Sequence, residues 1–330
     1  MPTDCVAPQN WRLCSERLVG SPSKLLSLHW LLDMSRARGI SMGSVLDAIA
    51  AERFIARLSS VERPVASISL TGYHLLPVAS KRPELLPAVV LRLCIGSDDG
   101  AVVSEAIESV CGIKLEDQCS FQLVRLGARS RPPDFARRVF FAEVSASVAG
   151  TAVHLPVELR VSFVERQPVE SLSYPSALSA EQNFLVPCQS LVAYTADLMT
   201  KVRATADLDT DAGLHFQLAY LVRHYWSKIP VVADKEFKAL RGALERRSEV
   251  SVTQILQSHR QVWLAAADDR RWAQRWSEFV GLRGYSRMLE PSRAQEEVPT
   301  KSTRAKRSVP PLVGWHEVAD EITQFLYRVD

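Results

Sequence analysis

The sequence predicts an α+β protein in which a β-rich middle section is followed by an all-helical region. Apolar residues recur at helical spacing before about residue 60 and again after about residue 189, whereas strand-like runs occupy the section between. The 330 residues are 47% hydrophobic and 23% charged, a composition typical of globular proteins. This length accommodates one large domain or two ordinary ones, with a substantial core.

Two helices are expected first, over Lys24–Arg38 and Ser44–Leu58, separated by Gly39 and Gly43. The β-rich section is expected to hold a helix over Ala101–Cys111, and Gly150–Thr151 indicates a hairpin turn. The expected strands are Ser67–Leu70, Val89–Ile95, Phe121–Leu126, Val139–Ala149 and Ala152–Phe163. The later helices are expected over Ser190–Ala204, Ala212–Trp226, Lys235–Arg246, Val252–Ser258, Val262–Gly281 and Trp315–Val329.

These elements predict five sections of chain. They are an N-terminal helical segment at 1–60 with a loose lead-in, a β-sheet core at 61–185, a helical domain at 186–288, a flexible linker at 289–311 and a C-terminal helix at 312–330. The linker carries a basic cluster, which fits either a solvated linker or a nucleic-acid contact. That cluster consists of Lys301, Arg304, Lys306 and Arg307.

Charge and cysteine usage exclude several classes of protein. The net charge of +3 gives no basis for generic polyanion binding. The longest uncharged run, Pro64–Ser80, contains Gly72 and His74, so we expect no membrane span, and charged residues near the start argue against a signal peptide. No CxxC pair occurs, which predicts reduced thiols in a cytoplasmic protein. The cysteines are Cys5, Cys14, Cys94, Cys111, Cys119 and Cys188.

The sequence offers few candidate catalytic or metal-binding motifs. The sequence contains no GxxxxGK[ST], GxGxxG or HExxH, and its seven histidines show no metal-ligand spacing. Ser97-Asp98-Asp99 follows an expected strand and offers carboxylates for a cation, but adjacent residues of an extended chain point to opposite faces. A turn is the alternative interpretation of these residues.

Ten segments occur in an order that suggests a known family. They are Ser23–Leu26, Ser35–Gly39, Ala51–Ser59, Ile68–Gly72, Arg82–Gly96, Cys111–Asp117, Leu159–Glu165, Ala196–Ala204, Gly213–Leu218 and Arg271–Trp276. Their order resembles the AbiEii/AbiGii family of nucleotidyltransferase-fold toxins, from bacterial abortive-infection and toxin–antitoxin systems. The resemblance implies a nucleotidyltransferase-like mixed β-sheet with flanking helices, followed by an all-α helical region.

The residues that bind metal in the family are replaced here. The family places a D-x-D pair on one strand and a third aspartate on a neighbouring strand, where carboxylates hold two magnesium ions. The D-x-D positions read Val90 and Arg92, and the third reads Arg160. The family's glycine-rich lysine position reads Thr71, followed by Gly72. Later polar positions read Leu214 and Gln217, whereas Lys201 is retained.

The replacements reverse the sign of the expected pocket. Three carboxylates would carry about −3, whereas Val90, Arg92 and Arg160 carry about +2, and each charge pair at 4 Å interacts by roughly 4 kcal/mol at an effective dielectric constant of 20. Arginine does not lose its proton to relieve this repulsion. The sequence therefore predicts no metal, no cofactor and no catalytic residues. A different strand register would bring Asp98 or Asp99, with Glu165, into a site for Mg²⁺ and NTP.

Three functions follow from this resemblance. The first is an inactive binding or assembly subunit with a protein partner, in a defence, toxin–antitoxin or mobile-element system. Candidates for binding a nucleotide phosphate, an RNA phosphate or an acidic partner are Arg92, Arg160, Lys201 and Gly72. The alternative for each arginine is pairing with a local carboxylate such as Glu158. The second function is an active transferase that modifies tRNA or protein.

The third function is a purely structural subunit of a complex. Tryptophan and arginine are enriched at interface hot spots, and several of them gather on the late helices. The interface candidates are Trp272, Trp276, Arg271, Arg275 and Trp315. The alternative is an internal core seam flanked by solvated arginines. The terminal helix either docks on a partner or folds back on its own domain.

Overall fold

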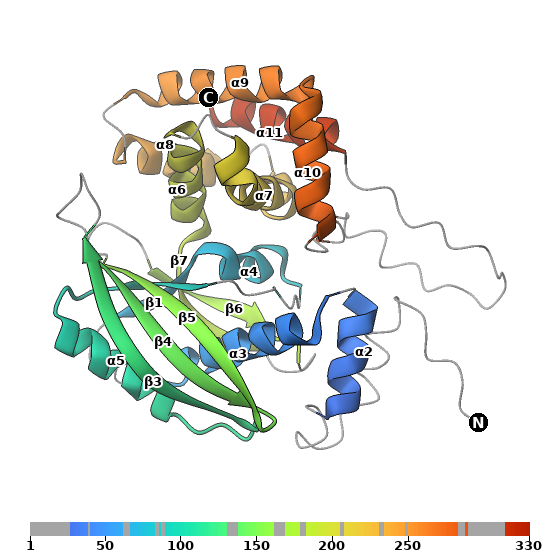
Figure 1. The fold of residues 1–330 in the computed structure, drawn as a ribbon. Coiled ribbons are helices and arrows are strands. Elements are labelled where there is room, and N and C mark those ends of the chain that lie inside the picture. Colours follow the sequence, from blue (N-terminus) through green and yellow to red (C-terminus); the bar gives the residue numbers. More distant parts are fainter. Residues whose placement is uncertain are drawn as a thin grey trace, which may run out of the picture. The chain divides into compact units, whose positions relative to one another are not determined.

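The computed structural model describes residues 27–38, 40–61, 67–82, 86, 90–130, 138–161, 169–178, 183–204, 208–230, 234–247, 250–282, 288–289 and 314–330. The chain forms two compact units, Met1–Leu191 and Val192–Asp330, and Figure 1 shows the sheet in the first and the helices of the second. The expected lead-in and the basic cluster of the linker lie outside the described residues.

The first unit contains a seven-stranded mixed sheet in the order β3-β4-β5-β2-β1-β7-β6. The pairs β2–β5 and β1–β7 are parallel and the other neighbours are antiparallel. The predicted α+β class is therefore confirmed. The strands are β1 (Ile68–Thr71), β2 (Leu91–Ile95), β3 (Cys119–Ser130), β4 (Arg138–Val148), β5 (Thr151–Val161), β6 (Val169–Pro175) and β7 (Asn183–Gln189).

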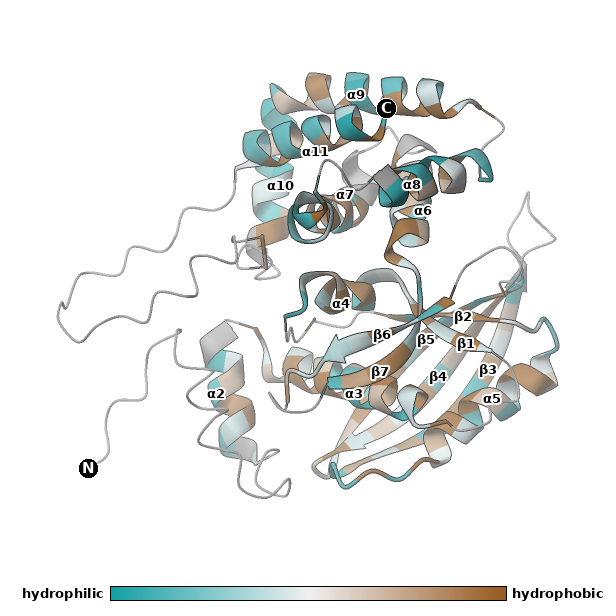
Figure 2. Ribbon diagram, turned by 180° about the vertical axis from the view of Figure 1, so that it is seen from behind, coloured by the Kyte–Doolittle hydropathy of each residue, from teal (hydrophilic) through white to brown (hydrophobic). Residues whose placement is uncertain are grey.

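Strands β6 and β7 were absent from the sequence prediction. Serines alternate with larger residues in β6, and β7 contains Pro187, which cannot donate a ladder hydrogen bond. Both features obscure the strand pattern, and β7 nevertheless pairs with β1 and β6 on its two sides. In Figure 2 the inner strand β7 is mostly brown and the edge strand β6 is paler, which agrees with the greater exposure of β6.

The hairpin between β4 and β5 is confirmed, with its turn one residue earlier than the predicted Gly150–Thr151. Ala149 and Gly150 form its two-residue turn with φ of 49° and 80°, and two positive φ values are typical of a type I′ turn. Val148 and Thr151 then face each other as the first pair of the ladder. Because a hairpin turn sets strand register, this turn decides which residues of β5 lie beside β4.

One face of the sheet packs against helices α3 (Met42–Ser59) and α5 (Gly100–Gly112). Leu91, Leu93, Val157 and Leu159 point toward this core and are almost completely buried. Successive strand residues point to opposite faces, so the polar residues between them belong to the other face. The unit also contains α2 (Leu28–Arg38), a 3₁₀ turn at Gly72–Leu75 and α4 (Leu76–Ser80).

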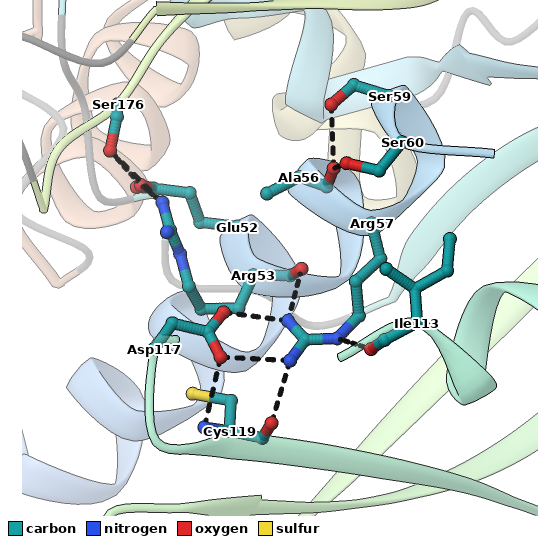
Figure 3. Close-up of polar contacts among 10 residues, drawn as sticks. All are labelled: Glu52, Arg53, Ala56, Arg57, Ser59, Ser60, Ile113, Asp117, Cys119 and Ser176. Atoms are coloured by element: carbon teal, nitrogen blue, oxygen red, sulfur yellow. Dashed lines mark hydrogen bonds and ion pairs between the residues drawn. The ribbon is translucent and has the colours of Figure 1, made fainter. Parts of the chain in front are cut away.

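Buried ion pairs fix α3 to its surroundings, as Figure 3 shows. The fully buried Arg57 uses all of its guanidinium N–H groups, and its bonds to the two carboxylate oxygens of Asp117 measure 2.8 and 2.9 Å. Nearby, the Glu52 carboxylate accepts bonds from Arg53, from the Ser176 hydroxyl and from a backbone amide. Glu52, Arg53 and Arg57 therefore connect α3 to residues that are distant in the sequence, namely Ser176, Asp117 and Cys119.

The second unit is helical. Its C-terminal helix α11 packs on α7, α8, α9 and α10 and buries seven apolar side chains. The break between α9 and α10 falls at Asp268–Asp269, where the Asp269 carboxylate accepts the Arg271 backbone N–H, and not near residue 260 as predicted. The helices are α6 (Leu191–Ala204), α7 (Leu208–His224), α8 (Asp234–Glu245), α9 (Val252–Ala267), α10 (Arg270–Leu282) and α11 (Trp315–Val329).

Candidate anion-binding site

The two strands that carry the candidate arginines are neighbours in the sheet. Parallel pairing of β2 and β5 places Arg92 beside Glu158 and Cys94 beside Arg160. Since alternate residues share a face, Arg92, Glu158 and Arg160 lie together on the face opposite α3. The structure thus brings Arg92 and Arg160 together, as the resemblance implies.

Glu158 lies between the two arginines and forms an ion pair with each. Arg160 Nε donates to Glu158 Oε1 at 2.7 Å, and Arg92 Nε lies 3.5 Å from Glu158 Oε2. The Glu158 side chain is 8% exposed, whereas those of Arg92 and Arg160 are 37% and 34% exposed. Within the described part of the chain, the outer Nη groups of both arginines have no hydrogen-bond partner. We call these three residues the arginine triad.

The triad corrects the charge predicted from the sequence. With Glu158 included, two positive charges and one negative charge leave an excess of one. The sequence-based sum of about +2 counted Val90, Arg92 and Arg160 and did not include Glu158, which the structure places between the two arginines. The alternative considered for each arginine, pairing with Glu158, is what the geometry shows.

The donors around the triad do not fit magnesium. Val90, immediately before β2, contributes an apolar side chain, and the Glu158 carboxylate is already held by two guanidinium groups. Divalent magnesium requires several oxygen ligands in near-octahedral geometry. Among the described residues no group of three or more His, Cys, Asp and Glu side chains could hold a metal ion.

The end of β1 borders the triad. Thr71 pairs in register with Arg92 and donates its hydroxyl to Gln189 Oε1. Gly72 follows with a φ of +75°, and a Cβ there would lie 3.1 Å from Cβ and Cδ of Arg92. Glycine thus supplies both the left-handed backbone and the space through which the Arg92 side chain passes.

His74 is a buried neighbour that the sequence did not single out. Burial, reinforced by the positive charge of Arg92, lowers its pKa from 6.5 to about 4, so the ring is neutral near pH 7. The side chain is 2% exposed, and neither ring nitrogen finds a hydrogen-bond partner among the described residues. His74 lies in the 3₁₀ turn that directly follows β1, and this turn places its ring in the buried position near Arg92. An isolated histidine in the sequence does not predict such a position.

The carboxylates of the alternative register lie elsewhere. Asp99 caps the N-terminus of α5 by accepting the Ala101 N–H at 2.8 Å, and Asp98 is exposed in the same turn. This is the turn that was the alternative interpretation of the Asp-Asp-Gly sequence. Glu165 lies outside the described residues.

The later candidate residues belong to the second unit. Lys201 is half-buried on α6, and Leu214 is half-buried on α7. Gln217 is buried, accepts the Tyr194 hydroxyl and donates to the Gly213 carbonyl at 2.8 Å. Gln217 therefore links α6 to α7, and its amide is occupied by structural hydrogen bonds.

Three of the interface candidates, Trp272, Trp276 and Trp315, form a cluster with Trp263. Trp315 stacks on Trp263 and Trp272 with ring centroids 5.2 and 4.9 Å apart, and Trp276 lies 5.3 Å away. Trp315 and Trp276 are 3% and 4% exposed. This arrangement is the internal seam considered as the alternative, and it makes both residues unsuitable as surface anchors. Arg271 is exposed and Arg275 half-buried, so they remain candidates.

The described cysteines are free thiols in buried or half-buried positions. Burial raises the pKa of Cys119 and of Cys188 to about 12, so neither is an activated nucleophile. In the part of the chain that the structure describes, no helix has both the length and the apolar character needed to cross a membrane.

The class of protein that emerges is an α+β protein with a mixed sheet followed by a helical unit. No protein-family model and no curated protein sequence matches the chain. It is similar to the crystal structure of JHP933 from Helicobacter pylori, with 9% identity and a TM-score of 0.45 over 88% of this chain and 92% of that one. It is also similar to a candidate nucleotidyltransferase from H. pylori, with 9% identity and a TM-score of 0.44 over 88% and 99%. Similarity at this level does not assign an activity.

Proposed function

We propose that this chain is a degenerate, catalytically inactive member of the nucleotidyltransferase-fold toxins that works as a binding or assembly subunit. The observation that carries the proposal is the arginine triad. Two adjacent strands, which in the resembled family present metal-binding carboxylates, here present two arginines joined by Glu158. Such a site attracts an anionic group and repels a divalent cation.

The geometry of the triad suits a phosphate or carboxylate ligand. Both arginines contact Glu158 through Nε, so their outer Nη groups remain available for an incoming anion. Arginine presents these donors in a rigid, planar arrangement that matches two oxygens of a phosphate or carboxylate. Because each side chain is about a third exposed, a ligand can reach them without unfolding the sheet.

Binding in the absence of magnesium tests this proposal. Isothermal titration with ATP, CTP, GTP and tRNA in EDTA should show binding that is lost in an Arg92→Ala, Arg160→Ala double variant. Lys114→Ala, an exposed cation elsewhere in the same unit, is the matched control and should bind normally. The phosphate version of the proposal fails if no ligand binds, or if the double variant binds as the unaltered protein does.

An active nucleotidyltransferase is the second candidate, because Glu158 retains one carboxylate beside β2. Incubation with radiolabelled nucleotides, magnesium and total tRNA decides between the two functions. We expect no incorporation of label into tRNA or protein. Incorporation that is abolished by Glu158→Gln would establish the enzyme and overturn the proposal of an inactive subunit.

A further inference from the structure

The sheet face that carries the triad continues across β4 to the edge strand β3. A bulge between Leu123 and Arg125 shifts the alternation of β3, so that Arg125 lies opposite Glu143 and Arg129 opposite Val139. On the other side of β4, Phe141 pairs with Glu158 and Val139 with Arg160. Arg125 and Arg129 of β3 therefore share one face with the triad.

This face is accessible on β3 and β4. Arg125, Arg129 and Glu143 are exposed, and Phe141 is half-buried. The helices of the first unit that pack on these strands, α3 and α5, lie on the opposite face with the buried apolar residues. The guanidinium carbon of Arg129 lies 5.4 Å from the centre of the Phe141 ring, so a cation and an aromatic surface are presented together.

The charges on this face are mixed but predominantly positive. Arg92, Arg125, Arg129 and Arg160 are its arginines, and Glu143 and Glu158 its glutamates, so four positive and two negative charges leave an excess of two. No ion pair joins Arg125 or Arg129 to a carboxylate within the described residues, and both guanidinium groups are open to a partner. We call this set the arginine face.

We infer that the arginine face docks an acidic, partly apolar polypeptide segment of another protein. Arg129 and Arg160 lie two strands apart, roughly 10 Å, and Arg125 and Arg129 lie four residues apart, roughly 13 Å. Carboxylates three or four residues apart in an extended segment match this spacing. An apolar side chain between them would contact Phe141.

Charge complementarity favours a polypeptide over a nucleic acid. A nucleic-acid strand carries one charge about every 3.4 Å along the helix axis, and the two glutamates interspersed among the arginines would repel such a backbone. The inference deepens the proposed binding role by naming the class of partner, and it does not require the triad to bind a nucleotide.

The test uses the full chain and fluorescence anisotropy with a fluorescein-labelled peptide in which glutamate alternates with leucine and serine. The same peptide with glutamine for glutamate, and labelled oligothymidylate, are the comparison probes. We expect the acidic peptide to bind, and Arg125→Glu with Arg129→Glu to weaken it by about tenfold or more. The glutamine peptide should bind more weakly than the glutamate peptide.

Lys114→Glu reverses one charge at an exposed site away from this face, half the charge change of the double variant, and should leave peptide affinity unaltered. Arg125→Gln with Arg129→Gln serves as a second, milder variant, with circular dichroism to check the fold. Equal binding by the folded double variants, or tighter binding of oligothymidylate than of the acidic peptide, would overturn the inference. Loss of peptide binding in the Arg125 and Arg129 double variants, with ATP binding intact, would show that these two arginines bind the peptide independently of nucleotide binding at the triad.

Discussion

Replacing Glu158 with glutamine is expected to tighten anion binding at the Arg92–Arg160 pair. Glutamine has nearly the same shape, and its carbonyl oxygen can still accept the hydrogen bond that Arg160 Nε donates to Glu158. The substitution therefore keeps the hydrogen bond to Arg160, replaces the oxygen that faces Arg92 Nε with an amide nitrogen, and removes the negative charge between the two guanidinium groups. The triad changes from an excess of one positive charge to an excess of two.

The size of the effect follows from the geometry. An anion on the outer edges of the two guanidinium groups would lie roughly 6 Å from the Glu158 carboxylate, a repulsion of about 3 kcal/mol at an effective dielectric constant of 20. Because the arginine side chains are 37% and 34% exposed, water screens part of this repulsion. We expect a net gain of about 1 to 2 kcal/mol, or roughly 5- to 30-fold in the dissociation constant.

Isothermal titration with ATP in EDTA measures this gain, and thermal unfolding confirms that the variant is folded. Glu143→Gln is the matched control, since it removes one negative charge from an exposed position of the same sheet face. Its effect should be much smaller. Unchanged or weaker ATP binding by folded Glu158→Gln would refute the reasoning, as would an equal gain in Glu143→Gln.

Two further predictions concern stability. Arg57→Met should lower the free energy of unfolding by about 3 to 5 kcal/mol in urea denaturation, because it leaves the Asp117 carboxylate without its buried partner. A loss below about 1 kcal/mol would contradict the stabilising role of the Arg57–Asp117 ion pair. The pKa of His74 is about 4 in the folded protein and 6.5 in the unfolded chain. Between these pH values the unfolded chain binds more protons than the folded protein, so the free energy of unfolding should fall as the pH drops from 6.5 to 4. His74→Leu should flatten this part of the profile in thermal melts, and an unaltered slope would count against the buried, neutral ring.

Local patterns in the sequence predicted most of the secondary structure. Helical and alternating spacing of apolar residues located the longer helices and five of the seven strands, and Gly150–Thr151 indicated the hairpin, whereas the short helix α4 was not predicted. The prediction failed at β6 and β7, where Pro187 and the serines of β6 break the pattern that a strand usually shows, and at the α9–α10 break, where Asp269 acts as a helix cap.

The sequence by itself determined the class of fold and the candidate arginines, because side-chain periodicity and the order of segments are local properties of the chain. The tertiary structure decided what those arginines do. The register between β2 and β5 places Glu158 beside Arg92, and packing around the turn after β1 buries His74. Both depend on residues far apart in the chain, so the charge and the partners of the site could be known only once the strands were paired.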